Sequence, residues 1–152
     1  MSFIIPIKVI KHAEDLPVPK HATLHSAGTD LIAAVTDSIV LNSQQRALIP
    51  TGLIMAIPQG YEGQIRPRSG LAIKHGITVL NSPGTIDSDY RDEVKVILIN
   101  LGELPFEVTR GMRIAQLVIA KYQTVELSTE NYDNDSHEST DRHGGFGSTG
   151  SF

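Results

Sequence analysis

The stretch Val94-Lys95-Val96-Ile97-Leu98-Ile99 favours a β-strand, because it is rich in β-branched residues and is bounded by residues that favour turns. Its apolar residues fall on both alternating faces. A strand of this kind is covered on both sides instead of facing solvent on one. We expect other subunits to supply some of that cover.

Similar apolar, β-branched segments lie on either side of this stretch and are separated by clusters of Gly, Pro, Asn or Asp. Together with it they give the predicted strands 3–10, 38–41, 47–57, 77–80, 94–101 and 112–127. A helix is expected only over residues 69–75, with Ser69 as N-cap and Gly76 as the stop. The 13 Gly and 8 Pro also favour short elements. The sequence therefore predicts an all-β, jelly-roll-like sandwich or barrel of short strands with one short helix.

The chain of 152 residues has the length of one domain followed by a tail. From residue 128 the sequence is polar and acidic and almost without aliphatic residues, so it cannot order itself by burial. The stretch 143–150 is rich in glycine, whose free amides can bind phosphate oxygens together with hydroxyl groups. We expect a β domain over residues 1–127 and a flexible C-terminal arm over residues 128–152 that orders on a nucleotide.

Composition limits the possible functions. The formal charge of -4 argues against general nucleic-acid binding, which needs many cations. The chain has no Cys, and its six His residues show no ligand spacing, so we predict no metal site built by the protein. The apolar run at the start is interrupted by Pro6 and Lys8, so it is too short for a signal peptide or a membrane span. A cytoplasmic protein is the default expectation.

Two segments have both a functional and a plain structural interpretation. Arg68 stands directly before the predicted helix, where a guanidinium and helix-start amides suit a phosphate, although a solvated Arg beside a capping Ser is common. The segment 81–90 is rich in turn formers and predicts a hairpin. It is either a turn with two solvated acids or a notch that reads a pyrimidine edge beside a reacting phosphate. Composition alone leaves both open.

Five segments, in this order, resemble the five motifs of the trimeric dUTPase family, and the likeness covers nearly the whole chain. They are Ala27-Gly28-Thr29-Asp30-Leu31, Arg66-Pro67-Arg68-Ser69-Gly70-Leu71-Ala72, Gly84-Thr85-Ile86-Asp87-Ser88-Asp89-Tyr90-Arg91, Gly111-Met112-Arg113-Ile114-Ala115-Gln116 and Gly144-Gly145-Phe146-Gly147-Ser148-Thr149-Gly150. A single match carries little weight, but five in order are specific.

The resemblance implies hydrolysis of dUTP to dUMP and pyrophosphate by in-line attack of water on the α-phosphate, which lowers dUTP and supplies dUMP for dTMP synthesis. It implies a homotrimer whose active sites are shared between subunits and closed by a swapped C-terminal arm. It further implies a Mg²⁺ ion that is held mainly by the triphosphate and water, with Asp30 touching the water shell.

The same resemblance assigns roles to individual residues. Asp87 is the expected general base, and Tyr90 is expected to pack under the deoxyribose. Uracil would be read by Asn81 and by the backbone around Thr85 and Ile86. The residues expected at the α- and β-phosphates are Arg68, Ser69, Gly70, Lys95 and Gln116. The residues expected to close the site are Arg142, Ser148 and Thr149 at the γ-phosphate and Phe146 stacked on uracil.

Three positions depart from the family pattern. Thr29 stands where an aromatic residue is frequent. Asp92 stands where Gly is usual, so the hairpin is strained if that position needs a positive φ. The segment that starts at Arg142 is one residue shorter than usual, which leaves the register of Arg142 open.

Two other functions are compatible with such a sequence. The first is a dCTP deaminase-type enzyme of the same fold, although the complete third motif argues against it. The second is a non-catalytic trimeric module that binds dUTP as a regulator.

Overall fold

The structure is a computed structural model that describes residues 4–129. Its strands are β1 (Ile7–Val9), β2 (Gly28–Ile32), β3 (Ile39–Leu41), β4 (Arg46–Met55), β5 (Tyr61–Arg66), β6 (Ile77–Val79), β7 (Gly84–Ile86), β8 (Val94–Asn100), β9 (Phe106–Val108) and β10 (Arg113–Lys121). Its helices are the 3-10 turn η1 (Lys11–Ala13) and the α-helix α1 (Ser69–His75).

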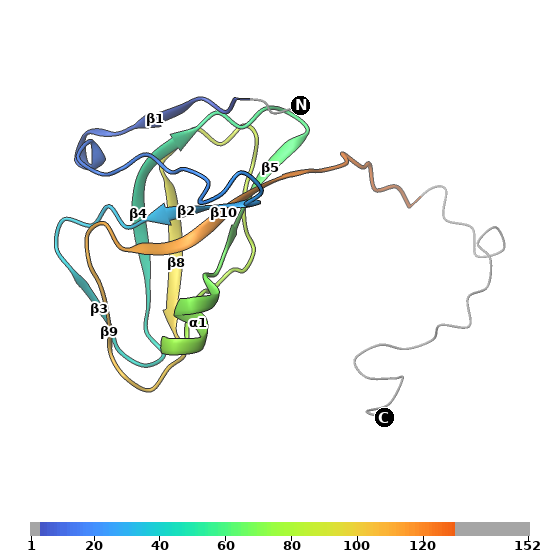
Figure 1. Ribbon diagram of the computed structural model, residues 1–152. Coiled ribbons are helices and arrows are strands. Elements are labelled where there is room, and N and C mark those ends of the chain that lie inside the picture. Colours follow the sequence, from blue (N-terminus) through green and yellow to red (C-terminus); the bar gives the residue numbers. More distant parts are fainter. Residues whose placement is uncertain (1–3, 130–152) are drawn as a thin grey trace.

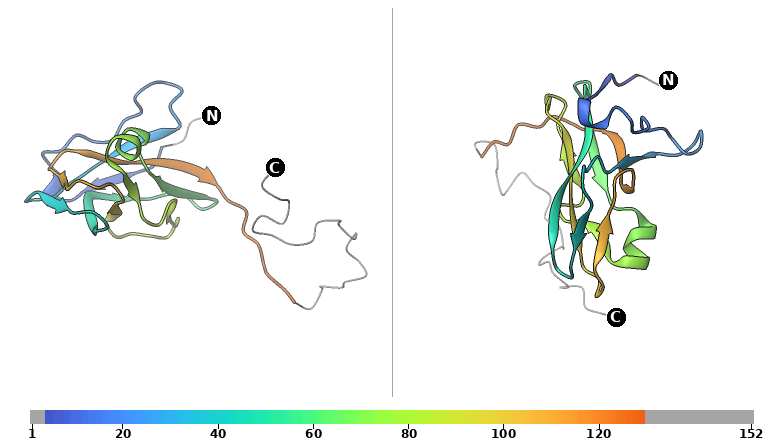
Figure 2. Two further views of the ribbon diagram at one scale, coloured as in Figure 1. Left: turned by 90° about the horizontal axis from the view of Figure 1, so that it is seen from below. Right: turned by 90° about the vertical axis from the view of Figure 1, so that its left-hand side faces the viewer.

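The strands form a sandwich of two four-stranded sheets, in the orders β1-β4-β8-β6 and β2-β10-β5-β7, with a small third sheet of β3 and β9. The sheet pairs are antiparallel throughout the described residues, and the core lies between the two large sheets. Figures 1 and 2 show α1 at the same end as β3 and β9, far from β1. The all-β, jelly-roll-like expectation is confirmed.

The two faces of strand β8 differ in burial. Its buried residues are Val94, Val96, Leu98 and Asn100, whereas the residues between them face outward. On that outer face Lys95 is exposed and Ile97 and Ile99 are half-buried. The described chain therefore covers one face of β8 and leaves an apolar strip open on the other.

The predicted helix is confirmed from Ser69 to His75, and Gly76 ends it in the left-handed conformation, with φ 68°. The amide of Gly76 bonds back to the carbonyls of Leu71 and Ala72, as in many helix ends. The prediction of Ser69 as N-cap was wrong. Arg68 occupies the N-cap with extended backbone, and its side chain makes no capping hydrogen bond.

Two strand predictions were too long. In the segment 3–10 the strand β1 is Ile7–Val9, and in the segment 112–127 the strand β10 ends at Lys121. The residues after β10 lead away from the body of the domain up to residue 129 (Figure 1), so they have no neighbouring strand with which to pair. No helix in the described part of the chain is long and apolar enough to cross a membrane.

Candidate functional site

The prediction of a hairpin over residues 81–90 was wrong in its pairing, because β6 pairs with β8 in one large sheet and β7 pairs with β5 in the other. The segment turns from one sheet to the other, and we keep the word hairpin for this turn together with β7. The register pairs Ile65 with Gly84, Gln64 with Thr85 and Gly63 with Ile86. Gly84 and Ile86 are buried, while Thr85 is exposed. At Gly84 a Cβ atom would lie 3.3 Å from Asn81 Nδ2, so glycine lets the Asn81 amide group approach the hairpin backbone closely.

A cavity of about 380 Å³ lies against this hairpin. Its lining is Leu48, Ile65, Val79, Asn81, Gly84, Thr85, Ile86, Asp87, Tyr90, Lys95, Val96 and Ile97. The structure thus brings together six predicted site residues, namely Asn81, Thr85, Ile86, Asp87, Tyr90 and Lys95. Pockets of a few hundred Å³ with an apolar floor and few polar groups are typical of small-molecule sites.

The tight turn after β7 presents Asp87 and Tyr90 to this cavity. The amide of Tyr90 donates to the carbonyl of Asp87 across 3.2 Å, which closes the turn. The Asp87 side chain is exposed and has no hydrogen-bond or ion-pair partner among residues 4–129. Its carboxylate oxygens are therefore open to a water molecule.

Asp92 does not strain the hairpin. Within the described chain Gln44 is the one residue other than glycine with a positive φ, of 66°, so Asp92 has an ordinary backbone conformation. Glycine is not needed there in this sequence. At the second departure, Thr29 Oγ1 lies 3.1 Å from His21 Nδ1, a hydrogen bond that an aromatic residue without a hydroxyl would not make.

Three predicted residues, Asp30, Arg68 and Gln116, lie with Arg113 where β2, β10 and β5 are side by side. We call Asp30, Arg68, Arg113 and Gln116 the arginine cluster. The register places Gln116 opposite Asp30 on one side and opposite Arg66 on the other. The first, second and fourth motifs thereby come together although 86 positions separate Asp30 from Gln116 (116 − 30).

The arginine cluster holds its side chains in place by polar contacts. Arg68 Nε donates to Asp30 Oδ1 across 3.0 Å, and Arg68 Nη1 donates to the carbonyl of Arg113 across 3.1 Å. Arg113 Nη1 lies 3.6 Å from Asp30 Oδ2, and Gln116 Nε2 donates to the carbonyl of Pro67 across 2.9 Å. Two guanidinium groups against one carboxylate leave a net positive charge, which suits a phosphate.

Small residues keep space open at the arginine cluster. A Cβ atom at Gly28 would overlap Gln116 Oε1, so a larger residue there would displace the amide. Ser69 and Gly70 are exposed at the start of α1, and a Cβ at Gly70 would meet nothing within 4 Å. The sequence prediction did not include Arg113 among the site residues. Its basic side chain in the fourth motif, three positions before Gln116, was the available signal.

Within a single chain, Asp87 lies far from the arginine cluster. On β5, Arg66 is level with Gln116, whereas Gly63 is level with Ile86, the residue before Asp87. Asp87 therefore lies level with Glu62, four residues from Arg66, which is roughly 13 Å at about 3.3 Å per residue. A base and the phosphate that it serves must lie within hydrogen-bond reach, directly or through one water.

The remaining predicted residues lie outside the described part of the chain. They are Arg142, Phe146, Ser148 and Thr149, and with them most of the predicted arm 128–152. Within residues 4–129 no three His, Asp or Glu side chains gather in a group that could hold a metal ion.

Comparisons with known proteins find relatives over most of the chain. A family model described as dUTPase matches residues 14–150. The chain is 57% identical over 147 residues to the deoxyuridine 5'-triphosphate nucleotidohydrolase of Wolbachia pipientis subsp. Culex pipiens, covering 96% of this chain and 95% of that protein. It is 61% identical over 124 residues to the protein of the same name from Aquifex aeolicus, covering 82% and 83% of the two chains.

Solved structures of dUTPases are also similar to this chain. The dUTPase of Staphylococcus bacteriophage 80alpha, as a point mutant with dUpNHpp, is similar with a TM-score of 0.81 and 25% identity. The match covers 98% of this chain and 99% of that one. The dUTPase of phage phi11 of S. aureus, as a point mutant described with a structural Mg(II) ion, is similar in fold, with a TM-score of 0.75 and 23% identity over 86% and 98% of the two chains.

Proposed function

This chain belongs to the dUTPase family, and we propose that it hydrolyses dUTP to dUMP and pyrophosphate, lowering dUTP and supplying dUMP for dTMP synthesis. The observation that carries the proposal is the hairpin cavity, which joins a base-sized notch to a free carboxylate. The comparisons favour neither deamination of dCTP nor a module without activity. A cytoplasmic location remains a prediction.

The hairpin provides the means to select uracil. Uracil offers an acceptor at O4 and a donor at N3, and cytosine reverses both. We infer that the side-chain amide of Asn81 and the backbone of Thr85 and Ile86 pair with this edge, so that cytosine would leave buried groups unpaired. We further infer that the tight turn excludes a thymine methyl group and that the Tyr90 ring, packed against the sugar, excludes a 2'-hydroxyl.

The chemical step follows from the position of Asp87. In this proposal the carboxylate accepts a proton from a water molecule while the water oxygen attacks the α-phosphorus in line. The bond from that phosphorus to the bridging oxygen breaks, and pyrophosphate leaves. Arg68, Ser69, Gly70, Lys95 and Gln116 hold the α- and β-phosphates, because fixed cations and amides stabilise the charge that develops on the phosphate oxygens.

The separation of Asp87 from the arginine cluster supports a shared active site. We propose that the hairpin of one copy faces the arginine cluster of the next in a homotrimer. The open strip on β8 supports an interface, because Ile97 pairs with Leu48, which is 54% exposed. Apolar residues next to each other on a surface commonly mark contacts with another protein.

The chain that follows β10 supports a swapped arm. Val125 and Leu127 are 68% and 93% exposed on a segment that leads away from its own domain. An apolar segment of this kind needs an apolar surface to pack on. A groove of about 470 Å³ beside β1 offers one, with a mainly apolar lining that includes Ile5, Ile7, Met55, Leu117 and Ile119. We propose that the arm crosses to another copy and brings Arg142, Ser148 and Thr149 to the γ-phosphate and Phe146 to uracil.

Magnesium fits this site as an ion that arrives with the triphosphate. The described residues offer no ligand group of their own, and both Asp30 oxygens already face guanidinium groups. Mg²⁺ usually keeps several waters and binds through substrate phosphates. Asp30 is the residue that would contact its water shell, and the ion would neutralise phosphate charge.

The test compares the parent chain with Asp87→Asn. Pyrophosphate release from dUTP is measured with and without Mg²⁺, alongside dCTP, dTTP and UTP. We expect Asp87→Asn to lower kcat by about 10²- to 10⁴-fold, because general-base catalysis contributes about that much, while the Kd of a non-hydrolysable dUTP analogue is kept. Unchanged turnover would exclude Asp87 as the base. Ammonium release from dCTP would instead identify a deaminase.

A further inference from the structure

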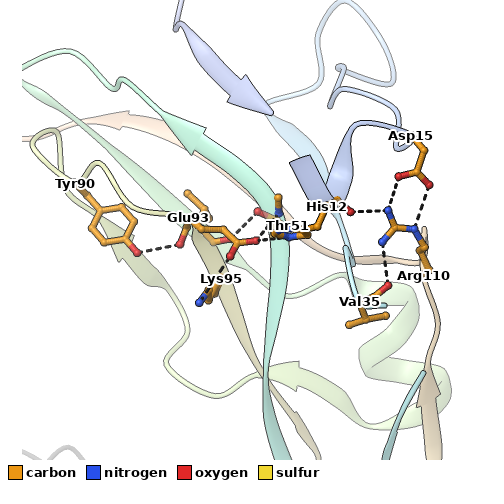
Figure 3. A network of polar contacts seen from close by, with 10 residues as sticks. His12, Asp15, Val35, Thr51, Tyr90, Glu93, Lys95 and Arg110 are labelled. Carbon is orange, nitrogen blue, oxygen red and sulfur yellow. Dashed lines mark hydrogen bonds and ion pairs between the residues drawn. The ribbon is translucent and has the colours of Figure 1, made fainter. Parts of the chain in front are cut away.

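Glu93 lies at the centre of a polar network that joins the hairpin cavity to the N-terminal turn η1 (Figure 3). Its Oε1 accepts hydrogen bonds from the amide of Gly52 across 2.8 Å and from His12 Nε2 across 3.1 Å. Its Oε2 lies 3.7 Å from Lys95 Nζ. Its backbone carbonyl accepts a hydrogen bond from the Tyr90 hydroxyl across 2.9 Å.

The Glu93 carboxylate is anchored to a rigid part of the fold. Gly52 belongs to the bulge in β4 opposite β8, where its φ is 70°. A Cβ atom at Gly52 would overlap Ala13 Cβ, so η1 packs directly on the bulge. The Thr51 hydroxyl beside it donates to the buried carbonyl of Val94 across 2.6 Å. A carboxylate held there fixes the chain segment that carries it.

Burial distinguishes this network from an ordinary surface ion pair. The Glu93 side chain is 14% exposed, and a largely buried carboxylate is costly unless it is paired and hydrogen-bonded. Glu93 satisfies that need with one amide and two cationic or polar side chains. Neither Asp87 nor the arginine cluster contacts it in any described hydrogen bond or ion pair, so Glu93 is linked to the proposed site through Tyr90 and Lys95.

We propose that Glu93 is a positioning residue that holds Tyr90 and Lys95 against the hairpin cavity and thereby sets the preference for deoxyribose over ribose. This inference rests on the proposed function, in which Tyr90 packs under the sugar. Tyr90 is held at two points, by its amide in the turn and by its hydroxyl on the backbone carbonyl of Glu93. The anchored carboxylate holds the second point still, so the ring cannot move aside for a 2'-hydroxyl.

The experiment measures kcat/KM for dUTP and for UTP in variants of Glu93. We expect Glu93→Ala to lower the dUTP to UTP ratio by about tenfold, because misplacement by a fraction of an ångström weakens an exclusion that depends on close packing. Glu93→Gln keeps the length needed to reach Gly52 and should restore most of the ratio. Glu93→Asp keeps the charge but falls short of that amide, so it should behave like Glu93→Ala.

Tyr90→Phe tests the same contact from the other side. It removes the hydroxyl that bonds to the backbone carbonyl of Glu93 and keeps the ring, so the ratio should fall by a few-fold. Asp15→Asn is the matched control, because Asp15 pairs with Arg110, whose guanidinium also bonds to the carbonyl of His12. It loosens the same turn by another route and should leave the ratio unchanged.

A further variant separates this inference from the function on which it rests. If Tyr90→Ala loses the preference for dUTP but Glu93→Ala, Glu93→Asp and Tyr90→Phe all keep it, the positioning role is overturned and the proposed function stands. If Tyr90→Ala keeps the preference, the placement of Tyr90 at the sugar is itself wrong. Should Glu93→Ala fail to fold in a thermal melt, Glu93→Asp and Tyr90→Phe decide the matter.

Discussion

Arg110 ties the N-terminal segment to the sheets through a single guanidinium (Figure 3). Its Nη1 donates to the carbonyl of Val35 across 3.0 Å, and its Nη2 donates to the carbonyl of His12 across 2.7 Å. The same guanidinium is hydrogen-bonded to Asp15, and these bonds hold the pKa of the Asp15 carboxyl below its ordinary value of 3.8. The part of the stability that comes from the Arg110–Asp15 pair therefore depends on whether the Asp15 carboxyl is ionised.

The lowered pKa of Asp15 gives its contribution a definite pH dependence. A carboxyl whose pKa is lower in the folded state stabilises that state above its unfolded pKa, and the effect disappears as the pH falls through the folded value. We therefore expect Asp15→Asn to lower Tm slightly at neutral pH, and the difference from the parent to shrink as the pH falls below about 3.8 and to vanish once the pH is below the lowered pKa of the folded state. A difference that persisted in acid would show that the ion pair is not its cause.

The sequence predicts some contacts of the hairpin and of the arginine cluster better than others. Asp87 and Tyr90 lie within one short hairpin, so their proximity follows from the turn. The part played by Glu93 could not be foreseen, because its partners Gly52 and His12 are 41 and 81 positions away. Arg113 was missed for the same reason, since its contact with Asp30 depends on the pairing of β10 with β2.

The strands that the sequence predicted include those with long apolar runs, β4 and β8, and also the short β-branched strands β3 and β6. The strands that it missed are β2, β5, β7 and β9. Strand β5, for example, reads Tyr61-Glu62-Gly63-Gln64-Ile65-Arg66 and has no apolar run, and it exists because β10 and β7 pair with it on both sides. Such strands depend on tertiary pairing more than on their own composition.

Asn100 joins three elements at the end of β8. It is fully buried, its Nδ2 donates to the carbonyls of Leu41 and Leu104 across 2.8 and 2.9 Å, and its Oδ1 accepts from the amide of Gly102 across 2.9 Å. One side chain thus satisfies three backbone groups of β3 and of the loop before β9. Few residues other than Asn offer two donors and an acceptor at this size.

Replacing Asn100 by Leu should therefore destabilise the domain strongly. The change leaves two carbonyls and one amide without this partner, and an unsatisfied buried group costs about 1 to 3 kcal/mol. We expect a loss of about 3 kcal/mol or more in the free energy of unfolding, measured by urea denaturation. Asn42→Leu, at an exposed polar position near the same loop, is the control and should cost much less. Equal losses would contradict the role given to Asn100.

The hairpin and the arginine cluster can form one complete active site only if copies of the chain assemble. The arginine cluster holds charge for phosphate, and its own carboxylate, Asp30, is paired with two guanidinium groups, whereas the hairpin holds Asp87 at the level of the other end of β5. A closed ring in which each copy presents one cluster to the next gives three identical complete sites. The exposed strip on β8 and the exposed residues after β10 are the surfaces that such a ring would cover.

Subunit complementation tests the shared site directly. Asp87→Asn and Arg68→Gln should each be inactive as pure assemblies. Trimers that contain both variants, purified through two different tags, should have about one third of their sites intact, because one neighbouring pair in three joins an intact hairpin to an intact arginine cluster. Trimers that combine Arg68→Gln with Gln116→Ala should stay inactive, since every copy then carries one change in its own arginine cluster and no intact cluster remains. If every site were built from a single chain, neither mixture would regain activity, and the shared site would be excluded.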